Sequence, residues 1–166
     1  AKTICSSLLL VIVPRHPERF TVVGSLCEGA GYSVQYRSAN QAVISGIDIV
    51  VGDTMGELLS MLGASDFAFV GGSLVPVGGH NLIEPAAWGI PVLSGPHMFN
   101  FSEVSQLLSD DEGLIVVDDE YALAQEVISL YNDVPRRKLI GMAAKQVAEN
   151  NRGALARLTK LIDEVL

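Results

Sequence analysis

The fold is decided by one stretch, Phe67-Ala68-Phe69-Val70-Gly71-Gly72-Ser73-Leu74-Val75-Pro76-Val77-Gly78-Gly79-His80-Asn81. A short apolar run leads into a loop with four glycines, and apolar residues at helical spacing follow in residues 82–88. A strand, a loop and a helix in this order form the repeating unit of an α/β fold. Because glycine permits positive φ and a close approach of the backbone to a ligand, we expect this loop to be shaped for binding.

The same alternation of strands and helices extends outward in both directions. Helical spacing predicts helices at residues 20–30, 55–62, 82–88, 101–108, 121–131, 137–150 and 155–166, and apolar runs predict strands at residues 8–13, 32–37, 47–51, 67–70, 91–94 and 114–117. The run Leu8–Val13 is wholly apolar, as expected for a strand buried on both faces. Strands that alternate with helices pair in parallel. We therefore predict an α/β fold, a Rossmann-like three-layer α/β/α sandwich with about six parallel strands and a helical C-terminal tail.

Composition limits the classes of function. The chain has 166 residues, 49% of them apolar, and a net charge of −8 from 11 basic and 19 acidic side chains. This apolar content excludes disorder, and the negative charge argues against a nucleic-acid partner. No apolar run approaches the roughly 20 residues of a membrane-spanning helix. We expect one domain, residues 1–166, and the abrupt start without a signal peptide indicates a fragment of a longer protein.

Ligands of parallel α/β sheets bind beyond the carboxyl ends of the strands. The loops that follow the predicted strands are residues 14–19, 52–57, 71–81 and 95–101, and we expect them all at one edge of the sheet. The glycine loop runs into a helix start, where free N–H groups and the helix dipole favour an anion. Arg15, between two prolines, suits a planar base or a phosphate.

Three of these loops place a capping residue three positions before a glutamate. For Thr54 with Glu57 and for Asn100 with Glu103, we expect a capping box at a helix start. For the third pair, Asn81 and Glu84, we favour contacts from Glu84 to ribose hydroxyls. His80 contacts a phosphate or a sugar carboxylate, or it packs, and the pattern leaves both open. We expect the single Trp88 in the core, and no residues have the spacing of a metal site.

Residues 14–20, 52–58 and 71–86 together resemble the C-terminal half of the 3-deoxy-D-manno-octulosonic acid (Kdo) transferases, and the resemblance extends over about residues 8–166. These glycosyltransferases attach Kdo to a lipid A precursor, lipid IVA, at the cytoplasmic face of the bacterial inner membrane. The resemblance implies the C-terminal half of a GT-B fold, which binds the donor CMP-Kdo. The membrane anchor, the acceptor site and the catalytic glutamate belong to an N-terminal half that this chain lacks. We therefore expect a soluble fragment with no catalytic residue of its own.

The resemblance also assigns roles to individual residues. Arg15 would contact the nucleotide near the cytosine, and the backbone of Met55 and Gly56 would frame the base. Glu84 would bind the ribose hydroxyls. The full set of donor-binding residues implied is Arg15, His16, Met55, Gly56, Gly72, Ser73, Gly78, Gly79, His80, Asn81 and Glu84. Transfer would be inverting and would need neither a metal nor another cofactor.

Two other functions remain open from the sequence. A GT-B donor domain that uses a UDP-sugar would also carry a glutamate at a glycine-loop helix. A Rossmann-like module that binds a partner protein would have no nucleotide site at all. Nucleotide preference separates the first alternative, and the absence of any nucleotide binding separates the second.

Overall fold

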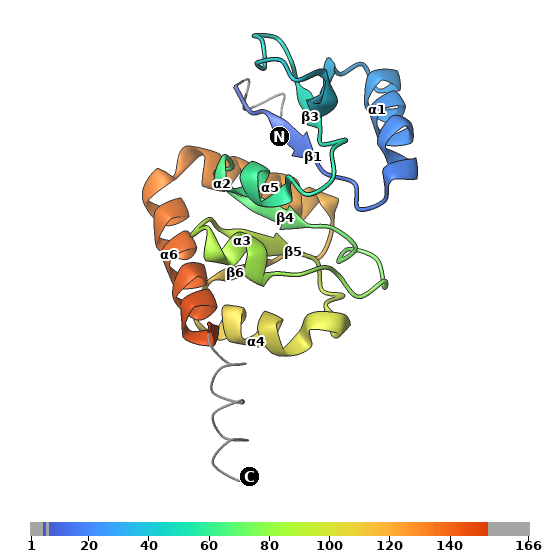
Figure 1. The fold of residues 1–166 in the computed structure, drawn as a ribbon. Helices are drawn as coiled ribbons and strands as arrows, with labels where there is room; N and C mark the ends of the chain where they lie inside the picture. The colour runs from blue at the N-terminus through green and yellow to red at the C-terminus, as the bar shows by residue number, and fades with distance from the viewer. Residues whose placement is uncertain (1–4, 6, 153–166) are drawn as a thin grey trace. The chain divides into compact units, whose positions relative to one another are not determined.

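The structure, a computed structural model, describes residues 5 and 7–152 of the chain. They divide into two units, residues 1–64 and residues 65–166, and each is considered by itself (Figure 1). Each unit contains its own three-stranded parallel sheet. In both units the strands alternate with helices along the chain, as the sequence predicts.

The first unit is built around a sheet with strand order β1-β3-β2. Its elements are β1 (Leu10–Ile12), η1 (Pro17–Arg19), α1 (Phe20–Gly29), β2 (Val34–Tyr36), η2 (Arg37–Ala39), β3 (Ile49–Val51) and α2 (Leu58–Gly63). Val51 at the end of β3 lies opposite Ile12 of β1 and Tyr36 of β2. The segments that follow these three strands therefore emerge at one edge of the sheet.

The second unit has strand order β4-β5-β6. Its elements are β4 (Ala68–Val70), α3 (Ile83–Ala87), β5 (Val92–Ser94), η3 (Phe99–Phe101), α4 (Ser102–Asp110), β6 (Leu114–Val116), α5 (Glu120–Asn132) and α6 (Val134–Asn151). Helices lie on both sides of this sheet, with α4 in yellow and α5 in orange on opposite sides (Figure 1). Val70 lies opposite Ser94, so the loops after β4 and β5 also share an edge.

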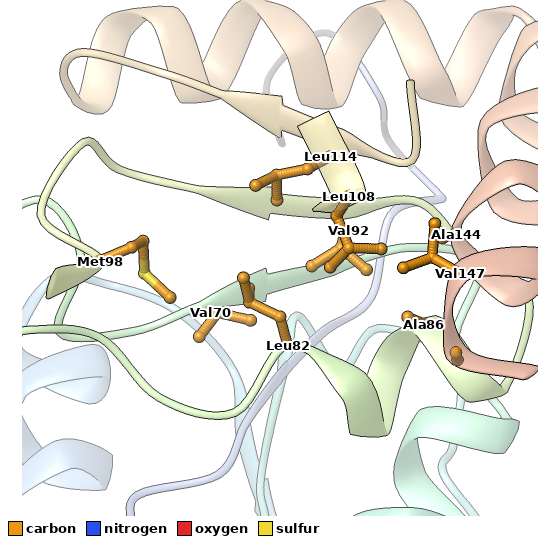
Figure 2. Close-up of a cluster of buried hydrophobic side chains, with 10 residues drawn as sticks. Val70, Leu82, Ala86, Val92, Met98, Leu108, Leu114, Ala144 and Val147 are labelled. Atoms are coloured by element: carbon orange, nitrogen blue, oxygen red, sulfur yellow. The ribbon is translucent and has the colours of Figure 1, made fainter. Parts of the chain in front are cut away.

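The core of the second unit joins the sheet to the helices. Side chains from β4, β5 and β6, from α3, α4 and α6 and from the residues just before α3 and η3 meet in one apolar cluster (Figure 2). It is made up of Val70, Leu82, Ala86, Val92, Met98, Leu108, Leu114, Ala144, Val147 and Ala148. A Cβ atom added at Gly141 of α6 would lie 2.1 Å from the carbonyl oxygen of Gly89. This glycine therefore lets the backbone of α6 approach the backbone at the end of α3 closely.

Two aspartates fix where the last helices begin. Asp119 accepts hydrogen bonds from the N–H groups of Tyr121 and Ala122, and Asp133 accepts one from Arg136. Asp133 separates α5 from α6, and Pro135 follows in the first turn of α6, where its missing N–H is harmless. The boundary predicted between the helices at residues 121–131 and 137–150 is confirmed, with Pro135 in the first turn of the second helix.

The arrangement of the strands differs from the prediction. All six strands are found and are parallel, but they form two sheets of three and not one sheet of six. Strand-helix alternation predicts parallel pairing, but it does not specify which strands pair. Burial on both faces of the first strand was also a wrong expectation, because β1 is an edge strand and Leu10 is 49% exposed. The fully buried strands are the central ones, β3 and β5.

Two further expectations need correction. Trp88 is not a core residue, because it lies at the C-terminal end of α3 and is 49% exposed. The helix expected from residue 55 begins at Leu58, because the loop before it turns through Gly56 with a left-handed φ of 81°. The helix expected at residues 155–166 lies outside the described residues. Among the helices of residues 7–152, none combines the length and apolar character needed to cross a bilayer.

Candidate functional site

The glycine loop between β4 and α3 has a defined backbone path. Three of its four glycines, Gly72, Gly78 and Gly79, have φ values of 70°, 97° and 71°. The N–H of Gly79 donates to the carbonyl of Gly72 over 2.9 Å, which closes the loop. The expected positive φ is thus confirmed at three glycines but not at Gly71. A side chain at any of these three positions would be strained.

Ser73 joins the start of the glycine loop to the loop after β5. Its hydroxyl donates to the carbonyl of Val70 and accepts from the N–H of Gly95 at 2.8 Å. Its carbonyl accepts from the N–H of His97 at 2.9 Å, and the residue is fully buried. The Ser73 hydroxyl is therefore occupied within the protein, and we expect it to shape the loop without contacting a ligand.

Asn100 holds the far end of the same loop. Its side-chain amide donates to the carbonyl of Val77, and its N–H donates to the carbonyl of Gly78, both at 3.3 Å. The loop is thus hydrogen-bonded at both ends, through Ser73 and through Asn100. The capping box predicted for Asn100 with Glu103 is wrong, because Asn100 lies within η3 and Phe101 is the N-cap of α4.

Glu84 lies in the first turn of α3 and is oriented by Asn81. The Asn81 side-chain oxygen accepts from the N–H of Ile83 at 2.9 Å, and its amide nitrogen donates to Glu84 Oε1 at 3.1 Å. Asn81 thus binds the first N–H of the helix and holds one oxygen of the half-buried Glu84 carboxylate, while Leu82 is the N-cap. A carboxylate fixed in this way can accept further hydrogen bonds from hydroxyl groups.

The helix that follows is shorter than expected. Helix α3 has only five residues, and the N–H of Ile83 is already bonded to Asn81. The dipole of one turn is small, so the expected anion at this helix start receives little support from the helix.

The remaining predicted site residues lie in the first unit, at the carboxyl edge of its sheet. Arg15 and His16 follow β1 and are exposed, and Met55 and Gly56 follow β3 and are also exposed. The N–H of Gly52 donates to the carbonyl of Ile12 at 2.8 Å, so the two loops leave neighbouring strands side by side. In each unit, the predicted loops therefore share one edge of the sheet.

The sequence patterns do not predict the network of side-chain hydrogen bonds at this edge. Arg37 Nη2 bonds Glu57 Oε1 at 2.9 Å, and Thr54 Oγ1 donates to the other Glu57 oxygen. Ser38 donates to both oxygens of Asp53, through its N–H at 2.8 Å and through its hydroxyl. The capping box predicted for Thr54 with Glu57 is therefore wrong, since α2 begins only at Leu58. Detecting the network requires knowing that β2 pairs with β3.

The hydrogen bonds from Ser38 change the acidity of Asp53. Partial burial alone would raise the pKa of this carboxyl, but hydrogen bonds from Ser38, followed by those from the backbone of Asp53 and Arg37, together outweigh it and hold the pKa below its ordinary value of 3.8. The carboxylate thus stabilises the folded chain above pH 3.8, and this contribution is lost as the pH falls through the lower folded-state pKa.

We expect the free energy of unfolding of the wild type to fall more steeply than that of Asp53→Asn between roughly pH 5 and pH 2. The asparagine does not titrate, so its profile lacks the contribution of this carboxyl. Urea unfolding at a series of pH values measures both profiles. Parallel profiles would show that Ser38 does not stabilise the ionised form.

The described residues contain no group of three His, Cys, Asp or Glu side chains arranged to hold a metal ion.

A scan against protein-family models found no match for the chain. Individual proteins do match. The chain is 44% identical over 161 residues to the 3-deoxy-D-manno-octulosonic acid transferase of Haemophilus influenzae, and 33% identical over 159 residues to that of Bordetella pertussis. These matches cover 96% and 95% of the chain but only 38% and 37% of the two relatives. The chain therefore spans well under half of the length of these relatives.

A solved structure matches with a TM-score of 0.83 and 30% identity, over 87% of this chain and 77% of the other. It is the crystal structure of the C-terminal CMP-Kdo binding domain of WaaA from Acinetobacter baumannii. Parallel sheets, helices on both sides and shaped loops at the carboxyl edges are the features of a Rossmann-like domain in the C-terminal half of a GT-B glycosyltransferase. With this neighbour and these relatives, the chain belongs to the family of Kdo transferases and corresponds to their C-terminal part.

Proposed function

We propose that this chain binds CMP-Kdo and forms the donor-binding part of a Kdo transferase. The observation that carries the proposal is the structural match, at a TM-score of 0.83, to a domain described as binding CMP-Kdo. The braced glycine loop and the oriented Glu84 carboxylate lie where a parallel α/β sheet binds its ligands.

In the proposed site, Glu84 accepts hydrogen bonds from the two ribose hydroxyls while Asn81 holds the carboxylate in place. Gly72, Gly78 and Gly79 bring the loop backbone close to the phosphate, and His80, whose Nε2 lies beside Gly72, faces the phosphate or the Kdo carboxylate. The Ser73 hydroxyl joins the loop to Val70 and Gly95 and does not contact the ligand in this proposal.

In the first unit, Arg15 provides a permanent positive charge for the nucleotide. His16 lies next to it, and the exposed backbone of Met55 and Gly56 frames the base. The cytosine preference itself is supported only by the family and by the neighbour's ligand.

For the whole protein, the proposed reaction is an inverting transfer of Kdo. The hydroxyl of a lipid A precursor attacks the anomeric carbon, and a base outside this chain removes its proton. The bond from the anomeric carbon to the phosphate breaks, and CMP leaves with the electron pair. N–H groups of the glycine loop stabilise the charge on the leaving phosphate. In this proposal, the described residues supply neither the acceptor site nor the base, and the whole protein acts at the inner membrane.

We expect CMP at a hundred times its Kd to raise the melting temperature of the chain by about 5–10 °C, because ligand binding then stabilises the folded state by roughly 2.7 kcal/mol. A thermal-shift series with CMP, CDP, UMP and UDP measures this preference. A larger shift with UDP than with CMP would move the assignment to a transferase that uses a UDP-sugar. No shift with any nucleotide, even at millimolar concentration, would contradict nucleotide binding by this chain.

A further inference from the structure

The loop that carries Met55 and Gly56 has few backbone bonds of its own. Its backbone hydrogen bonds within the described residues lie at its two ends, where the N–H of Asp53 donates to Val51 and the N–H of Met61 donates to Glu57. Gly56 has a left-handed φ of 81°, and no atom lies within 4 Å of the position that a Cβ would take there. The neighbouring Met55 is 69% exposed, so packing contributes little at the tip of this loop.

Side chains hold its two ends instead. Asp53 at the start receives two hydrogen bonds from Ser38, and Glu57 at the end receives the Arg37 guanidinium at 2.9 Å. The second Glu57 oxygen accepts from Thr54, inside the loop. Each carboxylate therefore has both oxygens bonded.

The two donors come from one short segment on the neighbouring strand. Arg37 and Ser38 follow β2 directly, and Tyr36 lies opposite Val51 of β3 in the parallel register. The segment Arg37–Ser38 thus bonds the loop after β3 on both sides of Met55 and Gly56. A loop held in its binding conformation before the ligand arrives has less freedom to lose on binding.

We infer that Arg37 and Ser38 are positioning residues, which fix the Asp53–Glu57 loop so that Met55 and Gly56 can receive the base. The inference rests on the proposed function, because Met55 and Gly56 are assigned to the base only there. A purely structural network would instead affect stability, and half-exposed ion pairs of this kind stabilise proteins little. Arg37 and Glu57 are 40% and 35% exposed.

The test compares the wild type with the double variant Arg37→Ala/Ser38→Ala. Hydrogen exchange without ligand reports the loop, and calorimetric titration with CMP reports the site. We expect exchange at the hydrogen-bonded amides of Asp53 and Met61, at the two ends of the loop, to accelerate, and the Kd for CMP to rise about tenfold through lost preorganisation. Exchange within α1 should stay as in the wild type. Arg37→Lys keeps the charge but loses the guanidinium fork, which bonds Glu57 through Nη2 and Asn40 through Nη1, so it should restore only part of the affinity when Ser38 is intact.

The second unit offers a matched control. Arg136 Nη2 bonds Glu126 Oε2 at 2.9 Å, and the two side chains are 35% and 31% exposed, much like Arg37 and Glu57. Arg136→Ala should leave the Kd for CMP unchanged.

The outcomes separate the inference from the proposed function. If the wild type binds CMP but the double variant binds it equally well, Arg37 and Ser38 are structural and the inference is wrong, whatever the exchange rates. If the wild type does not bind CMP, the proposed function fails, and the network is only a brace of the fold.

Discussion

Replacing Gly95 with alanine is expected to destabilise the second unit by about 3 kcal/mol, the upper end of the usual cost of overpacking. The added Cβ would lie 2.3 Å from the carbonyl oxygen of Ser73 and 2.6 Å from the backbone nitrogen of Leu74. These are backbone atoms, so the glycine loop must move away from β5 as a whole. The hydrogen bond from the Gly95 N–H to the Ser73 hydroxyl would be strained by the same movement.

Urea unfolding measures this effect, with fluorescence of the single tryptophan, Trp88, as a probe within the second unit. Gly71→Ala is the matched control in the neighbouring loop, since a Cβ there meets nothing within 4 Å and the φ is not left-handed. It should change stability by less than about 1 kcal/mol. Equal stability of Gly95→Ala and Gly71→Ala would contradict the close contact between Gly95 and the backbone of Ser73 and Leu74.

Replacing Glu84 with alanine is expected to weaken CMP binding by about 1.5–3 kcal/mol, the range for hydrogen bonds to a charged group. This corresponds to roughly a 10- to 150-fold rise in Kd. The physical reason is the loss of the carboxylate that Asn81 orients toward the proposed ribose position. Calorimetric titration with CMP measures the change, and a thermal melt of the same variant measures its stability.

Glu103→Ala provides the control for Glu84→Ala. Glu103 also follows an asparagine by three residues and also lies in the first turn of a helix, but it is exposed and has no place in the proposed site. Its replacement should leave CMP binding unchanged. An unchanged affinity of Glu84→Ala together with a lower melting temperature would mean that Glu84 only supports the helix start.

Much of the local structure follows from the sequence. The strands, the helices and the break at Pro135 were predictable, because apolar runs, helical spacing and punctuating residues act over short distances. The division into two sheets was not, since it depends on pairing between strands that are distant in the chain. Trp88 shows the same limit, because helical spacing does not reveal whether a partner covers that face.

The candidate site divides in the same way. The glycine loop was predictable, because positive φ at Gly72, Gly78 and Gly79 requires glycine. The structural role of Ser73 was not, because its partner Gly95 is 22 residues away. The three pairs with capping-box spacing have different outcomes, because Thr54 and Asn81 bond the glutamate three residues on, whereas Asn100 bonds Val77. The network from Arg37 and Ser38 depends on the β2–β3 register and was therefore hidden.

One measurement tests the central claim most directly, namely an NMR titration of the isotope-labelled chain with CMP, followed at every assigned backbone amide. The account predicts saturable shifts in residues 72–84 and at Met55 and Gly56, with UMP and UDP giving weaker effects at the same amides. Residues 120–151, in α5 and α6, should be unaffected. Saturable shifts confined to residues outside the glycine loop, or no shifts at millimolar CMP, would contradict the assignment of a CMP-Kdo site to this chain.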